Sequence, residues 1–394
     1  MRPGADTENA SHAFDAYGLA GEPGTDAFWA GVGAPVSVPT DADGGGGGGG
    51  GGGWTMLFLW RGAPATLSFE SWSDPVPLRR WRDSDCWYAE VAMPERLCVT
   101  YQFLVDGDGE GGGGGGGVMG LDGGAYADPF NPAGAGGDRS IAATPDVPAA
   151  PHWPLVGADD VLPVPRTRIR WASERLGGRR TVRVHPVGGG GPLVLLLDGD
   201  DWLYLHPAMT AFDAAVAAGE MPPVTLVFLP AKDRAAEFGC DPALWEAVRD
   251  ELLPLVAESG VPGDPGRLVV VGQSLGGLSA MYAALEFPEL VSRVACQSAS
   301  FWWTRDALGR ADLLAGPLGG AVAERLRERR ADLSGLRIAF DVGEHEVGML
   351  PHCEVVEGLV GEAGARVRVA RGAFGHDRAG WRGAVLRDVA WALG

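Results

Sequence analysis

The chain has 394 residues, of which 46% are apolar, so it is long enough for more than one domain with a sizeable core. Its 51 acidic residues outnumber its 32 basic residues and give a net charge of −19. Nucleic acids and anionic membrane surfaces repel a protein of this charge, so we expect neither as a partner.

The beginning of the sequence and the cysteines predict a cytoplasmic protein. Residues 1–24 contain one arginine, several acids and no apolar segment, which is unlike a secretion signal. No apolar run approaches the ~20 residues of a membrane span. The five cysteines are odd in number and no pair has C-x-x-C spacing, so we expect reduced thiols; they are Cys86, Cys98, Cys240, Cys296 and Cys353.

The first third of the chain reads as an all-β domain over residues 1–141. Short, aromatic-rich segments at 54–62, 65–72, 86–94 and 98–107 are bounded by Gly, Pro and Asp, which favours an antiparallel β-sandwich. Glycine runs at 44–53 and 111–117 separate strand-like segments. Because such runs have no side chain to pack, we expect them to form loops.

A Pro- and Ala-rich stretch at 142–165 predicts a linker, and residues 166–394 then change in pattern. Apolar, strand-like segments at 180–187, 192–199, 223–230, 267–274, 291–298, 336–343 and 365–372 alternate with helical segments at 208–220, 242–260, 278–289 and 353–364. This alternation predicts a mostly parallel sheet with helices on both faces.

The segment RLVVVGQSLGGLSA, from Arg267, predicts a nucleophile. A β-branched strand ends at Gly272-x-Ser274-x-Gly276, and a helix follows. A serine at the apex of such a strand-to-helix turn is held exposed. The N–H of Leu275 would lie at the helix N-terminus, where it is free to stabilise an oxyanion. A second N–H is expected from Gly199 or Asp200, although Asp198-Gly199 is as readily explained as a plain turn.

In an α/β-hydrolase the acid and then the histidine follow the nucleophile along the chain. His376 follows the last predicted strand, in a loop at the sheet edge that carries the serine. His352 is expected at the start of a helix and exposed to solvent, and His345 in the acid loop is a minor competitor. Among the carboxylates after the preceding strand, we favour Glu346 and keep Asp341 in reserve. No metal-ligand spacing or nucleotide-binding fingerprint is present, so we expect no metal and no cofactor.

With these residues in place, the sequence resembles the enterochelin (enterobactin) esterase family of α/β-hydrolases from about Trp54 to its end. The matching stretches are LLLDGDDW, GQSLGGLSA, CQSASFWW, DVGEHE and GHDRAGWRG, with TMLFLWRG and YADPFNP in the first third. The resemblance implies an Ig-like N-terminal domain, and it assigns Ser274 as nucleophile, His376 as base and Glu346 as acid.

The resemblance also implies a substrate, namely a cyclic trilactone siderophore with catecholate arms, usually in its ferric form. Trp302, Trp303 and Trp381 are candidates for stacking on catechol rings. Arg382 and Arg234 are candidates for binding catecholate anions. For each of them a purely structural role is an equal alternative.

Two alternative functions stay open on the sequence. A β-sandwich before an esterase also suits a hydrolase of carbohydrate esters, of the acetyl or feruloyl type, although such enzymes are usually secreted. A hydrolase-fold protein that binds its ligand without turning it over is the other alternative, against which the complete serine, acid and histidine set argues.

Overall fold

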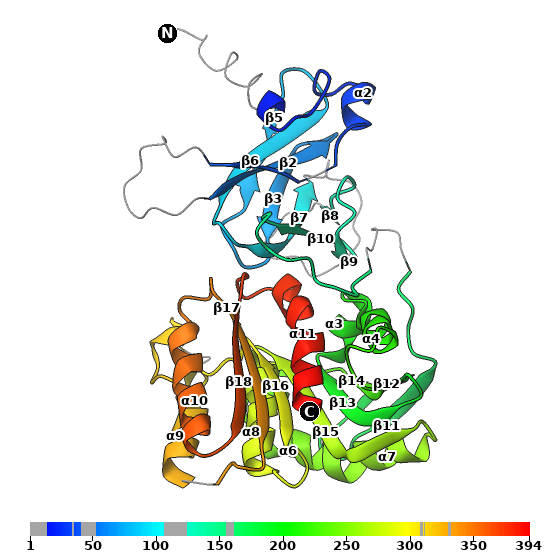
Figure 1. The fold of residues 1–394 in the computed structure, drawn as a ribbon, viewed down its shortest axis with the longest axis vertical. Coiled ribbons are helices and arrows are strands. Elements are labelled where there is room, and N and C mark those ends of the chain that lie inside the picture. Colours follow the sequence, from blue (N-terminus) through cyan, green and yellow to red (C-terminus); the bar gives the residue numbers. More distant parts are fainter. Residues whose placement is uncertain are drawn as a thin grey trace. The chain divides into compact units, whose positions relative to one another are not determined.

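The computed structural model describes residues 14–394 except 34, 41–52, 106–123, 155–160, 308–309, 311 and 330–331 (Figure 1). The first glycine run, except Gly53, and the whole second run lie outside the described residues. The prediction that these runs form loops therefore concerns residues that the structure does not describe. The chain divides into two compact units, residues 1–148 with 155–160 and residues 149–154 with 161–394. Strand β10 (Arg139–Ala143) extends two residues past the predicted domain end at 141, and the boundaries stay a prediction.

The first unit is all-β apart from short helical turns, as the sequence predicts. Its remaining elements are α2 (Asp26–Trp29), β1 (Val36–Pro39), β2 (Trp54–Arg61), β3 (Ala65–Phe69), β4 (Val76–Pro77), β5 (Arg79–Arg80), β6 (Cys86–Met93), β7 (Cys98–Val105), β8 (Gly124–Tyr126) and β9 (Gly134–Gly136).

Two antiparallel sheets make up this unit, one in the order β1-β2-β6-β5 and one in the order β4-β3-β7-β10-β9. Side chains of both sheets meet in one core. In β3 every second residue is buried, namely Ala65, Leu67 and Phe69, and these pack with Phe58 of β2 and Tyr101 of β7. This alternation follows from the two-residue period of a strand. That the unit is Ig-like stays a prediction.

The second unit is built from strands and helices in alternation. Its elements are β11 (Thr167–Ala172), β12 (Arg179–Val187), β13 (Gly191–Leu197), α3 (Gly199–Tyr204), α4 (Ala208–Ala217), β14 (Val224–Leu229), α5 (Arg234–Phe238), α6 (Pro242–Ala247), a π-helical turn η1 (Val248–Leu252), α7 (Leu253–Glu258), β15 (Gly263–Gln273), α8 (Leu275–Glu286), β16 (Arg293–Gln297), a 3₁₀ turn η3 (Leu313–Ala315), α9 (Gly320–Arg329), β17 (Arg337–Gly343), α10 (Leu350–Glu362), β18 (Arg366–Gly372) and α11 (Arg378–Leu393).

The eight strands form one sheet in the order β11-β12-β14-β13-β15-β16-β17-β18. Only β12 runs antiparallel to its neighbours, so the prediction of a mostly parallel sheet is confirmed. All seven predicted strands form, and β11 is an additional edge strand that the sequence analysis missed. Among the described residues, no helix has both the length and the apolar composition needed to cross a lipid bilayer.

Both faces of the sheet are covered by helices, as predicted. Alternate residues of β13 serve the two faces: Leu193 and Leu195 join a core with α6, α8 and α10, whereas Val194 and Leu196 join a second core with α4 and α11. Figure 1 shows α11 lying along the strands. Burial on both faces explains why the inner strands β13 and β14 are apolar throughout.

No helix was predicted after the loop that holds His376, and this part of the prediction was wrong. The structure begins α11 at Arg378, directly after Asp377, whose side chain accepts a hydrogen bond from the N–H of Ala379 at 2.7 Å. Gly380 and Gly383 lower the helix propensity of this segment and hid its start. Packing of α11 on the sheet outweighs that penalty.

Gly358 and Gly380 are interior helix residues that should respond in opposite ways to the same substitution. A Cβ atom at Gly358 in α10 would meet nothing within 4 Å, whereas one at Gly380 would lie 2.0 Å from the Phe374 ring. Gly358→Ala should raise the free energy of unfolding by ~0.5–1 kcal/mol. Gly380→Ala should lower it by ~1–3 kcal/mol, because the ring must move. Urea unfolding checks both, and equal effects would contradict the packing described here.

Candidate active site

The turn between β15 and α8 holds Ser274 in a strained backbone conformation, with φ 53° and ψ −120°. The turn closes only because its flanking residues are small. A Cβ atom at Gly272 would lie 2.2 Å from the carbonyl carbon of Gly276, and one at Gly277 would lie 2.8 Å from the Cβ of Ala299. Ser274 is partly exposed at the apex, as the sequence predicts for a nucleophile.

Glu346 and His376 meet at the same edge of the sheet. Glu346 follows β17, His376 follows β18, and a distance of 2.7 Å joins Glu346 Oε2 to His376 Nδ1. The Glu346 side chain is 1% exposed and the His376 side chain 37%. Because a carboxylate only accepts hydrogen bonds, this contact places a proton on Nδ1 and leaves Nε2 as the potential base.

Ser298, which the sequence analysis did not single out, connects the carboxylate to a tryptophan. Its hydroxyl donates to Glu346 Oε1 at 2.5 Å and accepts from Trp381 Nε1 at 2.8 Å. The N–H of Gly343 also donates to Oε1, at 2.9 Å. The Trp381 ring in turn packs edge-on against the His376 ring, with centroids 5.1 Å apart. Glu346, Ser298, Trp381 and His376 therefore form a closed ring of contacts.

Ser300 is a second residue that the sequence analysis missed. Its Oγ lies 3.1 Å from Ser274 Oγ, and its N–H donates to the Ser274 carbonyl at 2.9 Å. The N–H of Ser274 donates to the carbonyl of Gln297 at 2.9 Å. The four residues 297–300 thus contact the Ser274 turn at both ends, through Gln297 and Ser300, and the buried carboxylate through Ser298. Both serines lie in CQSASFWW, but no pattern within that stretch distinguishes them from loop serines.

Backbone strain concentrates at this edge. Of the six described non-glycine residues with positive φ, three follow the neighbouring strands β13, β15 and β16. They are Asp198 at 52°, Ser274 at 53° and Ser298 at 45°. Such conformations cost roughly 1–3 kcal/mol each and cluster at functional sites.

The two expected oxyanion donors begin helices that follow adjacent strands. Gly199 is the first residue of α3 after β13, and Leu275 is the first residue of α8 after β15. The first N–H groups of a helix have no partner within it. A side chain at Gly199 would lie 2.4 Å from the backbone of Leu229, so only glycine allows this close approach.

Arg234, a candidate for binding substrate with a structural role as the alternative, contacts both of these turns. Its guanidinium forms an ion pair with Asp198, with Nε 2.9 Å from Oδ1, and its Nη2 donates to the carbonyl of Gln273 at 3.0 Å. The side chain is 39% exposed. These contacts favour a role in holding the Asp198 turn against the end of β15.

Three other candidate substrate contacts are largely buried. Arg382 is 7% exposed and its guanidinium lies 5.3 Å from the centroid of the Trp153 ring, and Trp381 is 9% exposed. Trp302 is 8% exposed and packs against Ala307 and Met349. These placements favour the structural alternative over direct contact with substrate.

Asp341, the reserve candidate for the acid, is engaged elsewhere. It lies within β17, where its Oδ2 accepts from Arg387 at 2.5 Å. Burial raises the pKa of Asp341 and also that of Asp388 beside it. His352, expected to be exposed, is 1% exposed, because its ring contacts the backbone of Gly319 and Leu314. His345 donates its backbone N–H to the carbonyl of Phe374.

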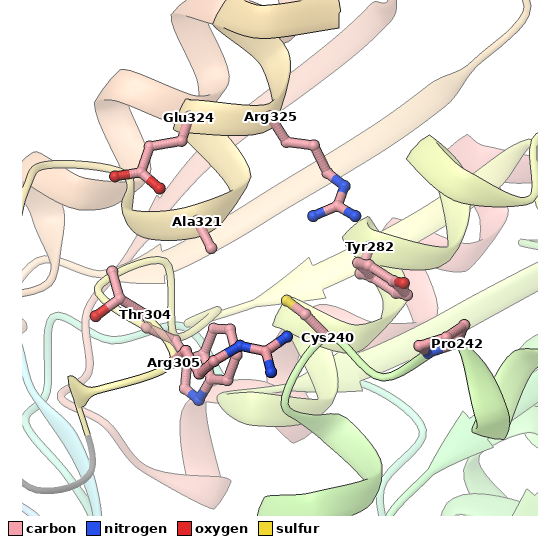
Figure 2. A pocket seen from close by; sticks show the side chains of 9 residues that line it. Cys240, Pro242, Tyr282, Thr304, Arg305, Ala321, Glu324 and Arg325 are labelled. Atoms are coloured by element: carbon pink, nitrogen blue, oxygen red, sulfur yellow. The ribbon is translucent and has the colours of Figure 1, made fainter.

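A pocket of about 400 Å³ lies alongside α8, which contributes Tyr282, eight residues after Ser274, to its lining (Figure 2). It is lined by Cys240, Pro242, Tyr282, Trp303, Thr304, Arg305, Ala321, Glu324 and Arg325. Burial raises the pKa of the Cys240 thiol to about 12, so this thiol is no nucleophile. None of the triad candidates lines the pocket, so the polar edge around Ser274 remains the candidate site. All five cysteines are described, and none of them forms a disulfide.

Comparison with known proteins decides the family. A family model described as putative esterase matches residues 173–391, and one described as enterochelin esterase, N-terminal, matches residues 55–153. The iron(III) enterobactin esterase of Dickeya dadantii (strain 3937) is 32% identical over 351 residues, which are 82% of this chain and 80% of that relative. The chain belongs to the enterobactin esterase family.

Solved structures of enterobactin esterases agree with this assignment. The ferric enterobactin esterase of Salmonella typhimurium matches with a TM-score of 0.74 and 26% identity, over 93% of this chain and 98% of that one. The Shigella flexneri enterobactin esterase, solved in the presence of 2,3-dihydroxy-N-benzoyl-serine, gives the same values. The resemblance on which the sequence analysis relied is therefore confirmed, and so is the α/β-hydrolase fold with an all-β region before it.

Replacing each of the two candidate acids by its amide should separate them. Glu346→Gln should lower kcat for an aryl acetate by ~10²-fold or more, because an amide can donate to Nδ1 and favour the wrong tautomer of His376. Asp341→Asn should change kcat by less than ~5-fold, since its carboxylate faces Arg387. Steady-state kinetics decides, and a larger loss in the Asp341 variant would reverse the assignment.

Trp381 should act through His376 and not through the substrate. Trp381→Phe keeps most of the ring but removes the Nε1 donor to Ser298. We expect kcat/KM to fall by a similar factor, ~5–10-fold, for a small aryl acetate and for a large catecholate ester. Side-by-side kinetics on the two esters is the measurement. A loss confined to the large ester would instead show that Trp381 binds substrate.

Proposed function

We propose that this protein is a serine esterase that hydrolyses the ester bonds of catecholate trilactone siderophores. The single observation that carries the chemistry is the buried Glu346–His376 pair at the sheet edge that also carries the strained Ser274. The substrate rests on family membership and on relatives named iron(III) enterobactin esterase.

In the proposed mechanism Ser274 Oγ attacks the carbonyl carbon of a serine-lactone ester while Nε2 of His376 takes the hydroxyl proton. Glu346 remains a carboxylate and holds the imidazolium through Nδ1. The N–H groups of Leu275 and Gly199 would stabilise the tetrahedral oxyanion. Collapse expels the serine alkoxide of the substrate, which receives the proton from His376.

Water completes the cycle. His376 takes a proton from a water molecule, the resulting hydroxide attacks the acyl group on Ser274, and the second tetrahedral intermediate releases the carboxylic acid. The proton then returns to Ser274 Oγ. Each turn opens one ester bond, so repeated turns would reduce a trilactone to single arylamide-serine units.

We extend the proposal to a ferric substrate and to a cytoplasmic location. Cleavage of the trilactone after import would lower the affinity of the siderophore for iron, so that the iron is released inside the cell. The names of the relatives support the ferric form, since they refer to iron(III) enterobactin.

Removing the nucleophile should abolish hydrolysis without unfolding the protein. Ser274→Ala deletes one oxygen atom and should lower kcat by ~10³-fold or more. Chromatography of a ferric and an iron-free catecholate trilactone, an acetylated xylan and a feruloyl ester tests reaction and substrate together. Near-normal turnover by the variant would reject the mechanism, and preferential cleavage of the carbohydrate esters by the unmodified protein would reject the substrate.

A further inference from the structure

A row of arginines lies at the edge of the sheet opposite the candidate active site. Arg293, Arg337 and Arg366 are the first residues of the adjacent strands β16, β17 and β18, and they are register partners of one another. Register partners in parallel strands point to the same face, ~4.8 Å apart. Arg267 of the next strand, β15, adds a fourth guanidinium. We call these four residues the arginine row.

The positive charge of this row is not neutralised by neighbouring carboxylates. Among the described residues, none of the four forms an ion pair, although the chain carries a net charge of −19. Further along β18 the pattern differs, since Arg368 pairs with Asp388 at 2.6 Å and Arg371 with Glu357 at 2.8 Å. Within β18, Arg368 and Arg371 therefore have carboxylate partners, whereas Arg366, the first residue of the strand, forms no ion pair among the described residues.

The electrostatic field at the row is correspondingly positive. Burial and the charges of the other three row arginines lower the pKa of Arg337. Burial and Arg267 lower that of Arg293, and Asp264 opposes this shift. Like charges this close destabilise one another, so a bound anion would relieve the repulsion.

Two of the four row arginines donate hydrogen bonds to carbonyl groups at the end of α11. Nη2 of Arg267 donates to the carbonyl of Leu393 and Nη2 of Arg337 to that of Trp391, each at 2.6 Å. These bonds satisfy carbonyls of the last helical turn. They do not involve Arg293, which donates to Ser292 Oγ, or Arg366, which is exposed. Within the part of the chain that the structure describes, the buried Nε atoms of Arg293 and Arg337 have no hydrogen-bond partner, although the Arg337 guanidinium lies over the Trp391 ring.

We propose that the arginine row binds a small multivalent oxyanion, with inorganic phosphate as the simplest example. Guanidinium groups match the oxygens of phosphate in pairs and keep their charge when partly buried. The site is separate from the esterase reaction and does not depend on it. Its occupant would lie beside the last turn of α11, the helix that begins two residues after His376, and only the arginines would hold it there, because the carbonyl end of a helix disfavours anions.

The test uses the full-length protein and inorganic phosphate, with sodium chloride at equal ionic strength as reference. We expect phosphate to raise Tm in a saturable manner, beyond any change with chloride, and calorimetric titration to give a single site. Arg366→Gln and Arg293→Gln should each weaken phosphate binding by ~10-fold. Arg366 is exposed, so that variant keeps the test valid if the Arg293 variant folds poorly.

Arg170→Gln is the matched control. Arg170 is an exposed arginine on β11 without an ion pair among the described residues, so its loss removes the same charge elsewhere. Its phosphate affinity should stay within ~2-fold of the unmodified protein. Equal effects of phosphate and chloride, unchanged affinity in both row variants, or an equal loss in the control would each overturn the proposal.

Discussion

The candidate site depends on one buried carboxylate. Glu346 is removed from water, and a buried charge is tolerated only when hydrogen bonds replace its hydration. Three donors do so here: the imidazole of His376, the hydroxyl of Ser298 and the N–H of Gly343. Each donor comes from a different part of the chain, so satisfying one side chain fixes the relative positions of the ends of β16, β17 and β18.

This constraint spreads to the nucleophile through residues 297–300. The same short segment contacts Glu346 through Ser298 and the Ser274 turn through Gln297 and Ser300. A shift of β16 by one residue would therefore disturb acid and nucleophile together. The parallel register between β15 and β16, which pairs Gln273 with Gln297, prevents such a shift.

Much of this arrangement could be predicted because it follows from local patterns. Apolar segments predicted the central strands of the second unit, and the alternating segments RTVRVHPV and ARVRVARG predicted β12 and β18. Only β11 was missed, whose alternating TRIRWA reflects burial on one face. The glycines around Ser274 predicted its turn, since only small residues let it close. The order of nucleophile, acid and histidine along the chain placed the acid and the base after Ser274, and the family resemblance favoured Glu346 and His376, which the structure brings together.

What the sequence analysis missed depends on contacts between distant segments. Nothing beside Ser298 in the sequence indicates that its hydroxyl lies between Glu346 and Trp381. Arg234 reads as a free cation until the fold brings Asp198 to it, 36 residues away. Gly380 and Gly383 lowered the helix propensity at the start of α11, so neither this part of the helix nor the burial of Trp381 was predicted. Tertiary packing, which a local pattern does not contain, decided each of these cases.

The positive φ of Ser274 sets catalysis against stability. A glycine at this position would adopt the same backbone at less cost, but it would remove the oxygen of the proposed nucleophile. The native residue thus keeps the fold below the stability that its backbone could reach, and only selection for activity maintains it. In a lineage that no longer needed the esterase activity, substitutions would accumulate early at this turn. The free energy of unfolding would then rise at first, through relief of the backbone strain, and fall only later.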